Sequence, residues 1–253
     1  DVNDRFQRTL IRAGGESIKD QNMLSITGER TLVDNLSFVS SLYSFIFSDD
    51  RGLGLNDLAT TRALAGATWR LSDHFTLSPL AGFSIDNQQG IQDEGFMYST
   101  QFLVNGLRFG QTDASAEFFH SAEHITTRFQ HEYRGNADLT ARISESSVNQ
   151  TQVTFRDTRR EFYLLDNALG IDANAHSRIE TRREQTIGLR DMLRYSVFDA
   201  LSFIANVDVS QRKILRERDS YQMDVDAPFF STYISEFTLN GSGQFDYNNT
   251  VGT

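Results

Sequence analysis

The sequence lacks three features that are common in proteins of its length, 253 residues. It has no cysteine, which excludes disulfides and thiolate metal sites. It has no long hydrophobic run: the most apolar stretch, SSLYSFIF, is far shorter than the roughly 20 residues of a transmembrane helix, which is therefore excluded. It has only two prolines, where average usage is roughly 5%. A shortage of proline is expected of long hydrogen-bonded strands, because proline removes a donor from the ladder.

Acidic residues outnumber basic ones, with 34 Asp and Glu against 24 Lys and Arg. The formal net charge is −10 and the pI is about 4.9, which argues against a nucleic-acid-binding protein with a basic face. The mean hydropathy of −0.41 resembles that of a water-soluble protein. It does not exclude a membrane β-barrel, because half of each spanning strand faces a polar lumen. No signal peptide is recognisable in the start DVNDRFQRTL, so the chain is either a mature form or was never exported.

What the sequence does contain is a two-residue alternation of apolar and polar side chains. From Phe75 to Ile85 the odd positions read Phe, Leu, Pro, Ala, Phe and Ile, while the even positions between them are mostly polar or small. The same period runs through 96–104, 129–143, 187–197, 201–212 and 233–247. Alternation predicts strands with one apolar and one polar face. It persists for about nine to twelve residues, near the roughly 9–11 that a tilted strand needs to cross hydrocarbon.

The connections between these segments fall into two kinds. Short ones place Asp in a tight reversal, as in LVDNLSF, LSDHFTL and VFDALSF. Longer polar ones read SDDRGLGLND, DNQQGIQDEG, LLDNALGIDANAH and RERDSYQMDVDAP. Short turns at one end and long loops at the other predict an all-β, antiparallel up-and-down architecture. We expect a single β-barrel domain over residues 1–253, with about twelve strands.

Aromatic side chains gather beside the short turns. They are Trp69, Phe75, Tyr195, Phe198 and Phe203. Rings placed where a strand meets a turn are typical of the aromatic girdle at a membrane–water interface. We predict that these five residues form such a girdle.

Two hairpins, ATWRLSDHFTLSPLAGFS and LRYSVFDALSFIANVDVS, resemble those of bacterial outer-membrane β-barrels. The resemblance is one of pattern, covers most of the chain and points to no particular family. It implies a transmembrane barrel in the bacterial outer membrane, with short periplasmic turns and long extracellular loops. Two features depart from the pattern. The sequence ends FDYNNTVGT without a terminal aromatic, which suggests part of a larger barrel, and Pro79 lies inside a spanning segment.

No group of residues predicts chemistry. His120 and His124 would suit a zinc site on a helix, but on a strand they stand about 13 Å apart. Ser121 also occupies the position where an HExxH motif needs Glu. GLGLND matches no phosphate-binding loop, and the serines are too numerous to nominate a nucleophile. We therefore expect no enzyme activity, no catalytic residue, no metal and no cofactor.

The charged positions of the polar faces are more informative. Arg190, Arg194, Asn206, Asp208 and Arg212 belong to two strands joined by one turn and project to the same side. They line the lumen if the apolar side meets lipid; otherwise they are solvated residues on an exposed sheet face. The segments TFRDTRREFYLLD and SRIETRREQ carry charge on both faces, which is incompatible with hydrocarbon. We expect these two segments to pair with one another beyond the membrane.

The function favoured by this pattern is an outer-membrane barrel that allows or supports transport, as a porin-like channel or a receptor barrel. A TonB-dependent receptor with a plug domain is disfavoured, because no globular segment precedes the first alternating strand unless the chain is truncated. One alternative is a structural barrel that holds a partner in an envelope complex, and another is a soluble all-β secreted adhesin. The expected partners are outer-membrane lipid and other envelope proteins at the extracellular loops, with no nucleic acid.

Overall fold

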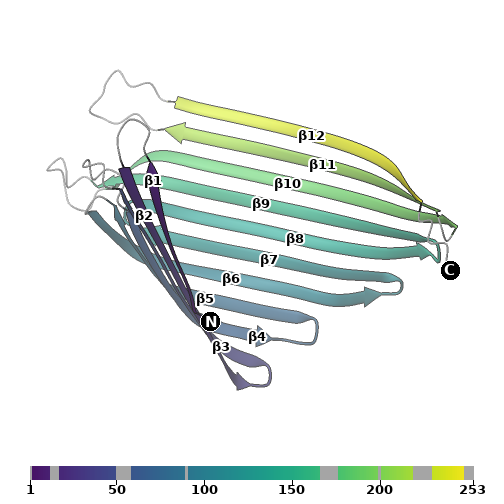
Figure 1. Ribbon diagram of the computed structural model, residues 1–253, viewed down its shortest axis with the longest axis horizontal. Coiled ribbons are helices and arrows are strands. Elements are labelled where there is room, and N and C mark those ends of the chain that lie inside the picture. The colour runs from purple at the N-terminus through teal and green to yellow at the C-terminus, as the bar shows by residue number, and fades with distance from the viewer. Residues whose placement is uncertain are drawn as a thin grey trace.

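The described residues form one antiparallel sheet of twelve strands in chain order (Figure 1). The computed structural model describes residues 2–11, 17–49, 58–88, 91–165, 176–198, 201–218 and 230–247. The strands are β1 (Val2–Ile11), β2 (Ser17–Val33), β3 (Leu36–Asp49), β4 (Leu58–Arg70), β5 (Phe75–Gln88), β6 (Ile91–Phe109), β7 (Thr112–Ile125), β8 (Arg128–Ser144), β9 (Ser147–Leu165), β10 (His176–Phe198), β11 (Leu201–Arg218) and β12 (Phe230–Tyr247). The predicted all-β, up-and-down architecture of about twelve strands is confirmed.

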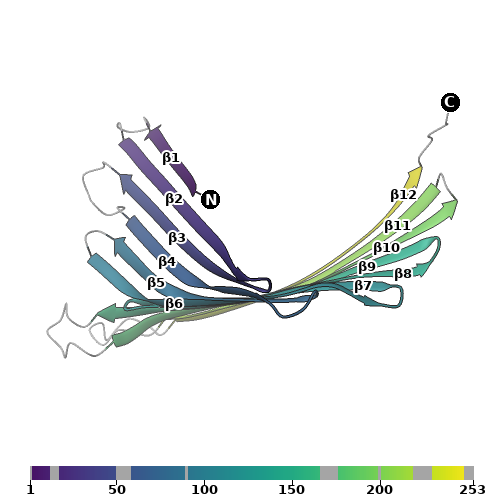
Figure 2. The same cartoon turned by 90° about the horizontal axis from the view of Figure 1, so that it is seen from below.

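The sheet curves into an open trough and does not close on itself (Figure 2). β1 and β12 are its two edges, and no pairing joins them among the described residues. Every strand pairs only with its neighbours along the chain, so every connection is a hairpin. The described residues include no helix with the length and apolarity needed to cross a bilayer.

The strand register carries the alternation of the sequence across the sheet. Phe75 of β5 is paired with Val104 of β6, and Phe102 of β6 with Phe118 of β7. Directly paired residues lie on the same side of a sheet. One side, which we call the apolar face, therefore carries the apolar positions of successive strands. The other side, which begins in β5 with Thr76, we call the polar face.

The turns agree with the sequence in part. Asp34–Asn35 joins β2 to β3 and residues 71–74 join β4 to β5, as predicted, whereas the turn expected after Phe198 lies outside the described residues. The loop predicted over 86–95 is wrong, because β5 runs to Gln88 and β6 begins at Ile91. Its polar residues resemble a loop by composition, but a strand whose two faces are both polar has the same composition. The other three long polar connections lie largely outside the described residues.

Pro79 interrupts the ladder on one side only. It is paired with Thr100 of β6, but the β4–β5 register has no pair at positions 67 and 68. In this gap the hydroxyls of Thr68 and Ser78 lie 3.1 Å apart, within hydrogen-bonding distance. The donor that proline lacks is thus missing on the β4 side, where a side-chain hydrogen bond links the two strands.

Three glycines permit a close approach of neighbouring strands: Gly66, Gly82 and Gly95. A Cβ atom on Gly82 would lie 1.8 Å from the carbonyl oxygen of Ala63, and one on Gly95 would lie 1.7 Å from that of His124. No side chain fits into such a space. The strands can therefore approach at these positions only because all three residues are glycine.

Candidate lumen-lining face

The polar face lies on the inside of the curved sheet. Arg62 of β4 forms an ion pair with Glu123 of β7 at 3.1 Å, and Arg128 of β8 forms one with Asp86 of β5 at 2.9 Å. Each pair reaches over two intervening strands, a separation of about 14 Å in a flat sheet. The side chains meet because the curvature brings their ends together. The polar face is therefore concave.

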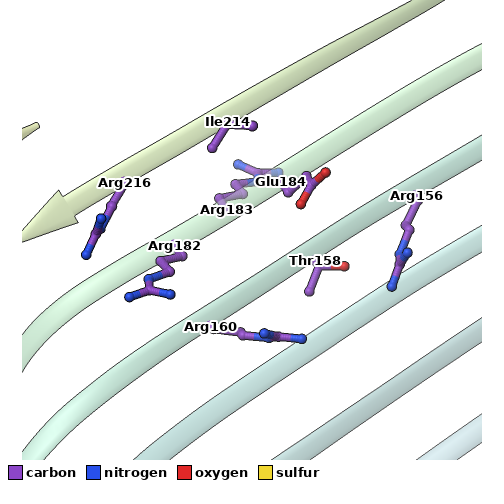
Figure 3. Close-up of a pocket in the computed structure, with 8 residues that line it drawn as sticks. All are labelled: Arg156, Thr158, Arg160, Arg182, Arg183, Glu184, Ile214 and Arg216. Carbon is purple, nitrogen blue, oxygen red and sulfur yellow. The ribbon is translucent and has the colours of Figure 1, made fainter. Parts of the chain in front are cut away.

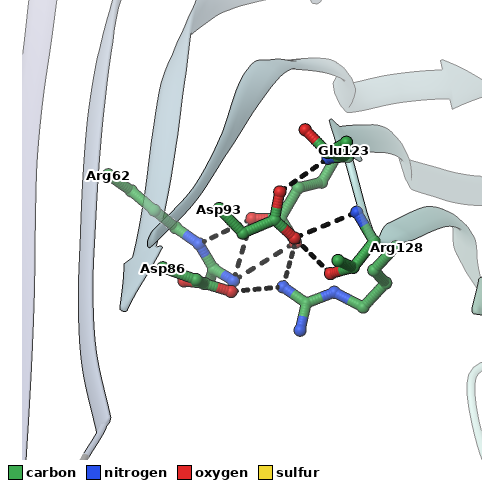
Figure 4. Close-up of polar contacts among 7 residues, drawn as sticks. Arg62, Asp86, Asp93, Glu123 and Arg128 are labelled. Atoms are coloured by element: carbon green, nitrogen blue, oxygen red, sulfur yellow. Dashed lines mark hydrogen bonds and ion pairs between the residues drawn. The ribbon is translucent and has the colours of Figure 1, made fainter. Parts of the chain in front are cut away.

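Glu123 is the centre of this network (Figure 4). The residue is only 6% exposed. Its carboxylate accepts hydrogen bonds from Arg62 Nε at 3.1 Å and from Arg128 Nη2 at 3.0 Å. The same Arg128 nitrogen also donates to Asp86. Charge-assisted hydrogen bonds of this kind are strong and directional, so the network fixes four strands relative to one another.

Asp93 secures the turn between β7 and β8 at the same end of the sheet. Its Oδ1 accepts a hydrogen bond from the Thr126 amide at 2.8 Å, and its Oδ2 accepts one from the Thr127 amide at 3.0 Å. The Thr127 hydroxyl donates to Oδ2 as well. A carboxylate from a neighbouring strand thus satisfies both amides of this two-residue turn.

The charged residues that were predicted to line a lumen lie on this polar face. Arg190 is paired in register with Asp208, and its Nε donates to the Asp208 carboxylate at 2.6 Å. Arg212 donates to Glu184 at 2.8 Å and lies 3.8 Å from a carboxylate oxygen of Glu236. These contacts form two separate groups of paired charges: one joins β10 to β11, and the other joins β10, β11 and β12.

Two further predicted residues share the same side. The Asn206 amide donates to the Ser242 hydroxyl at 3.4 Å, and Arg194 is paired in register with Ile204. The register thus places all five residues on one face of the sheet.

The five residues of the predicted girdle lie on the apolar face at the short-turn end. Trp69 is paired with Leu36 of β3, and Tyr195 with Phe203. Phe75 stacks on Phe102, with ring centroids 6.0 Å apart. Trp69, Tyr195 and Phe198 are about half exposed. Large exposed rings that gather in one band mark a surface that contacts lipid or another protein.

A second aromatic group lies on the apolar face toward the other end of the strands. The rings of Phe83 and Phe96 are 6.1 Å apart, and those of Phe96 and Tyr98 are 6.2 Å apart. This group was not predicted from the sequence, although the alternation of the two segments places its rings on the apolar side. Only the register shows that rings from separate strands meet.

His120, His124 and His131 also lie on the apolar face, among aromatic rings. His120 stacks on Tyr133 with centroids 4.3 Å apart, and His124 lies 4.0 Å from Phe129. His131, on the next strand, lies 5.8 Å from His120. Within the described ranges, no group of three or more His, Asp or Glu side chains is arranged to hold a metal ion.

The two charged segments pair with one another, as predicted. Arg160 of β9 is paired with Arg182 of β10, and β9 stays paired with β10 to its end, with a register shift between Arg178 and Glu180. On the side continuous with the apolar face, Arg183 donates to Asp157 at 2.6 Å. This part of the β9–β10 hairpin, residues 156–163 and 180–185, therefore carries charge on both faces. We call it the charged ribbon.

Solved structures share this architecture. The siderophore receptor PiuA from Acinetobacter baumannii superimposes with a TM-score of 0.52 at 5% identity, over 92% of this chain and 47% of the receptor. The fold is that of part of an outer-membrane β-barrel. The copper transporter OprC gives a TM-score of 0.49 at 9% identity, over 98% of this chain and 43% of that protein. The chain thus spans about half the length of both. No family model and no curated protein matches the sequence.

Proposed function

We propose that this chain forms part of the wall of an outer-membrane barrel that supports transport of solutes across the outer membrane. The apolar face contacts lipid and the polar face lines a water-filled interior. One observation carries the proposal: the concave face holds the ion-paired residues, while the opposite face holds exposed apolar and aromatic side chains. A barrel wall is the sheet arrangement that satisfies its backbone hydrogen bonds within hydrocarbon.

The dimensions of the apolar face support a membrane location. Phe75 and Phe83 belong to the two aromatic groups and are eight residues apart on β5, near the roughly 9–11 that a tilted strand uses to cross hydrocarbon. The five-residue girdle then lies at one interface and the second aromatic group at the other. The charged ribbon projects beyond the bilayer on the long-loop side. The partners are outer-membrane lipid and, through the loops, other envelope proteins.

Among transport barrels we favour a large receptor or transporter barrel over a porin. PiuA is a siderophore receptor, and this chain covers 47% of it. Barrels of outer-membrane transporters reach 22 strands, so a twelve-stranded wall is about half of one. The proposal assigns the chain no chemistry and no cofactor.

The absence of cysteine allows a direct test of which face meets water. Asn206 and Val207 are adjacent on β11 and lie on opposite faces. In outer-membrane vesicles that carry the full-length protein, we expect a membrane-impermeant maleimide to label the Asn206→Cys variant. The Val207→Cys variant should stay unlabelled until the protein is unfolded. Equal labelling of the two variants would contradict the proposal.

A second candidate is a structural barrel that holds a partner within an envelope complex. The observation that favours it is the matching of charges on the polar face, as in Arg62–Glu123 and Arg190–Asp208, which could lock the interior. Conductance of the full-length protein in planar bilayers separates the two candidates. Stepwise channels support transport, whereas an absence of channels together with a co-purifying partner protein supports the structural role.

A soluble adhesin is the remaining alternative and makes a different prediction. If the chain is part of a membrane barrel, the native protein leaves washed outer membranes only with detergent, and its gel mobility changes on heating. A protein recovered from the supernatant without any amphiphile would exclude both barrel proposals.

A further inference from the structure

Three arginines stand side by side in one row across the polar face. Arg182 of β10 is paired in register with Arg160 of β9 on one side and with Arg216 of β11 on the other. Neighbouring strands lie about 4.8 Å apart, so the row spans about 10 Å. Like charges placed directly opposite one another destabilise a sheet. The row therefore needs negative charge from another source to be stable.

The row lines an open pocket on the polar face (Figure 3). The pocket has a volume of about 310 Å³. Its other lining residues on this face are Arg156, Thr158, Glu184 and Ile214. Arg183 borders the pocket as well, but its guanidinium is bound to Asp157 on the opposite face. The pocket is thus mainly cationic and polar, with one apolar side chain.

The carboxylates of the protein do not neutralise the row. Glu180 serves two of its members: it is hydrogen-bonded by Arg182, and Arg216 Nε donates to it at 2.7 Å. Arg160 forms no ion pair with any residue in the part of the chain that the structure describes. One carboxylate thus stands against three guanidinium groups, which leaves the row with a surplus of positive charge.

The remaining acidic residues near the pocket serve other arginines. Glu132 lies 3.1 Å from Arg156, and Glu184 accepts a hydrogen bond from Arg212 at 2.8 Å. Neither carboxylate therefore forms an ion pair with an arginine of the row. A cationic pocket is unusual in a chain whose formal net charge is −10, so the local charge does not follow from the overall composition.

Guanidinium groups are suited to a particular kind of ligand. Each presents a planar fork of N–H donors that binds phosphate or carboxylate oxygens in pairs. Three forks spaced along about 10 Å can contact a ligand that carries more than one such group. A single small anion could reach only part of the row.

We propose that the row of Arg160, Arg182 and Arg216 is a binding site for a soluble anion with at least two phosphate or carboxylate groups. The inference deepens the proposed function, since it names the class of solute that the barrel interior would accept. Binding itself does not depend on transport, so the two can be tested separately.

Inorganic pyrophosphate is a suitable probe for the site. Titration of the detergent-solubilised full-length protein at low ionic strength should give saturable binding by calorimetry, and orthophosphate should bind more weakly. The Arg160→Gln variant should bind pyrophosphate about tenfold more weakly or worse, because it loses a charged hydrogen-bond donor. The Arg160→Lys variant keeps the charge but lacks the planar guanidinium fork. Its affinity for pyrophosphate should lie between those of the wild type and the Arg160→Gln variant.

Two further variants make the test specific: a matched control that should not change the affinity, and a variant that should increase it. Arg142 lies on the same face of β8, twelve residues along the strand from Gln130, the cross-strand partner of Arg160. The Arg142→Gln variant removes the same charge about 40 Å away and should leave the affinity unchanged. The Glu180→Gln variant frees two arginines of the row and should tighten pyrophosphate binding several-fold, which a purely structural role of these residues would not produce.

Three results would overturn the site: no saturable binding by the wild type, an Arg160→Gln variant that binds like the wild type, or an Arg142→Gln variant that loses as much affinity. The last would indicate general attraction to a charged surface. Failure of the site is distinguishable from failure of the proposed function. A protein that is embedded in outer membranes but does not bind loses only the site, whereas one that binds but is released without detergent loses only the membrane proposal.

Discussion

At the scale of single residues, Glu123 shows how one side chain joins strands that are not neighbours. It is nearly buried and bound to Arg62 and Arg128. The Glu123→Gln variant leaves both arginines, which are 37% and 26% exposed, without their shared anion. We expect it to lower the free energy of unfolding by about 2 kcal/mol. Urea unfolding of the protein in detergent micelles measures the change.

An exposed ion pair supplies the control for that variant. Arg108 and Asp113 lie 3.1 Å apart, but their side chains are 73% and 56% exposed. The Arg108→Gln variant should change the free energy of unfolding by no more than about 0.5 kcal/mol. If both variants cost the same, the network around Glu123 does not stabilise the curved sheet.

Glu180 carries the clearest pH dependence of the charged ribbon, which lies outside the proposed membrane-spanning part. Its hydrogen bond from Arg182, supported by Arg216, lowers the pKa of the carboxyl from 4.5 to about 2. A lowered pKa in the folded state contributes stability above the unfolded pKa, and the contribution is lost as the pH falls toward the folded pKa. The stability difference between the wild type and Glu180→Gln should be constant above about pH 5.5 and disappear near pH 2. Urea midpoints over this range measure it, and a difference that does not vary with pH would refute the assignment.

At the scale of elements, alternation predicted strands within β5, β6, β8, β10, β11 and β12 and which side of each is apolar. The other six strands were not among the segments that it delimited. Loops were harder to predict. The polar stretch 86–95 has the composition of a loop, but it is mostly strand, since β5 runs to Gln88 and β6 begins at Ile91. The two-residue turn at Thr126–Thr127 could not be foreseen either. Its amides are satisfied by Asp93, more than 30 residues earlier in the sequence, and composition does not reveal that contact.

The close approach of β4 and β5 at Gly82 predicts that a larger residue at this position destabilises the sheet. In the Gly82→Ala variant the new methyl group would meet the Ala63 carbonyl at 1.8 Å, so the backbone must move. We expect a loss of about 3 kcal/mol in unfolding free energy and a lower yield of the heat-modifiable form. Gly135→Ala on β8 is the control, since its methyl group would only make ordinary contacts, with Phe155 Cβ at 3.9 Å and the Glu117 carbonyl oxygen at 4.0 Å. Equal effects of the two substitutions would contradict the steric argument.

At the scale of the whole molecule, the two faces could be predicted but the curvature could not. Arg190, Arg194, Asn206, Asp208 and Arg212 fell on one side because a period of two fixes the side of every residue once a turn is placed. The Arg62–Glu123 pair was missed because its partners lie on strands three apart, and they meet only when the sheet bends. The row of Arg160, Arg182 and Arg216 was missed for a related reason: it depends on the register of three strands. Long-range contacts of this kind are set by twist and register, which hydropathy alone does not encode.

The proposed function requires that lipid contacts the apolar face and water contacts the polar face. Two adjacent residues of β9, one on each face, can test this arrangement. Val153 is 41% exposed on the apolar face, whereas Gln152 lies on the polar face and donates to Asp138 at 2.9 Å. If the apolar face contacts hydrocarbon, Val153→Arg should cost about 2–4 kcal/mol, as for a cation near the middle of a bilayer. Gln152→Arg should be tolerated, because the new guanidinium gains the Asp138 carboxylate as a neighbour. The yield of heat-modifiable protein in outer membranes and the unfolding free energy in lipid vesicles measure both effects. Loss of stability in the Gln152→Arg variant alone would mean that lipid lies against the polar face, and equal tolerance of both variants would mean that neither face meets lipid.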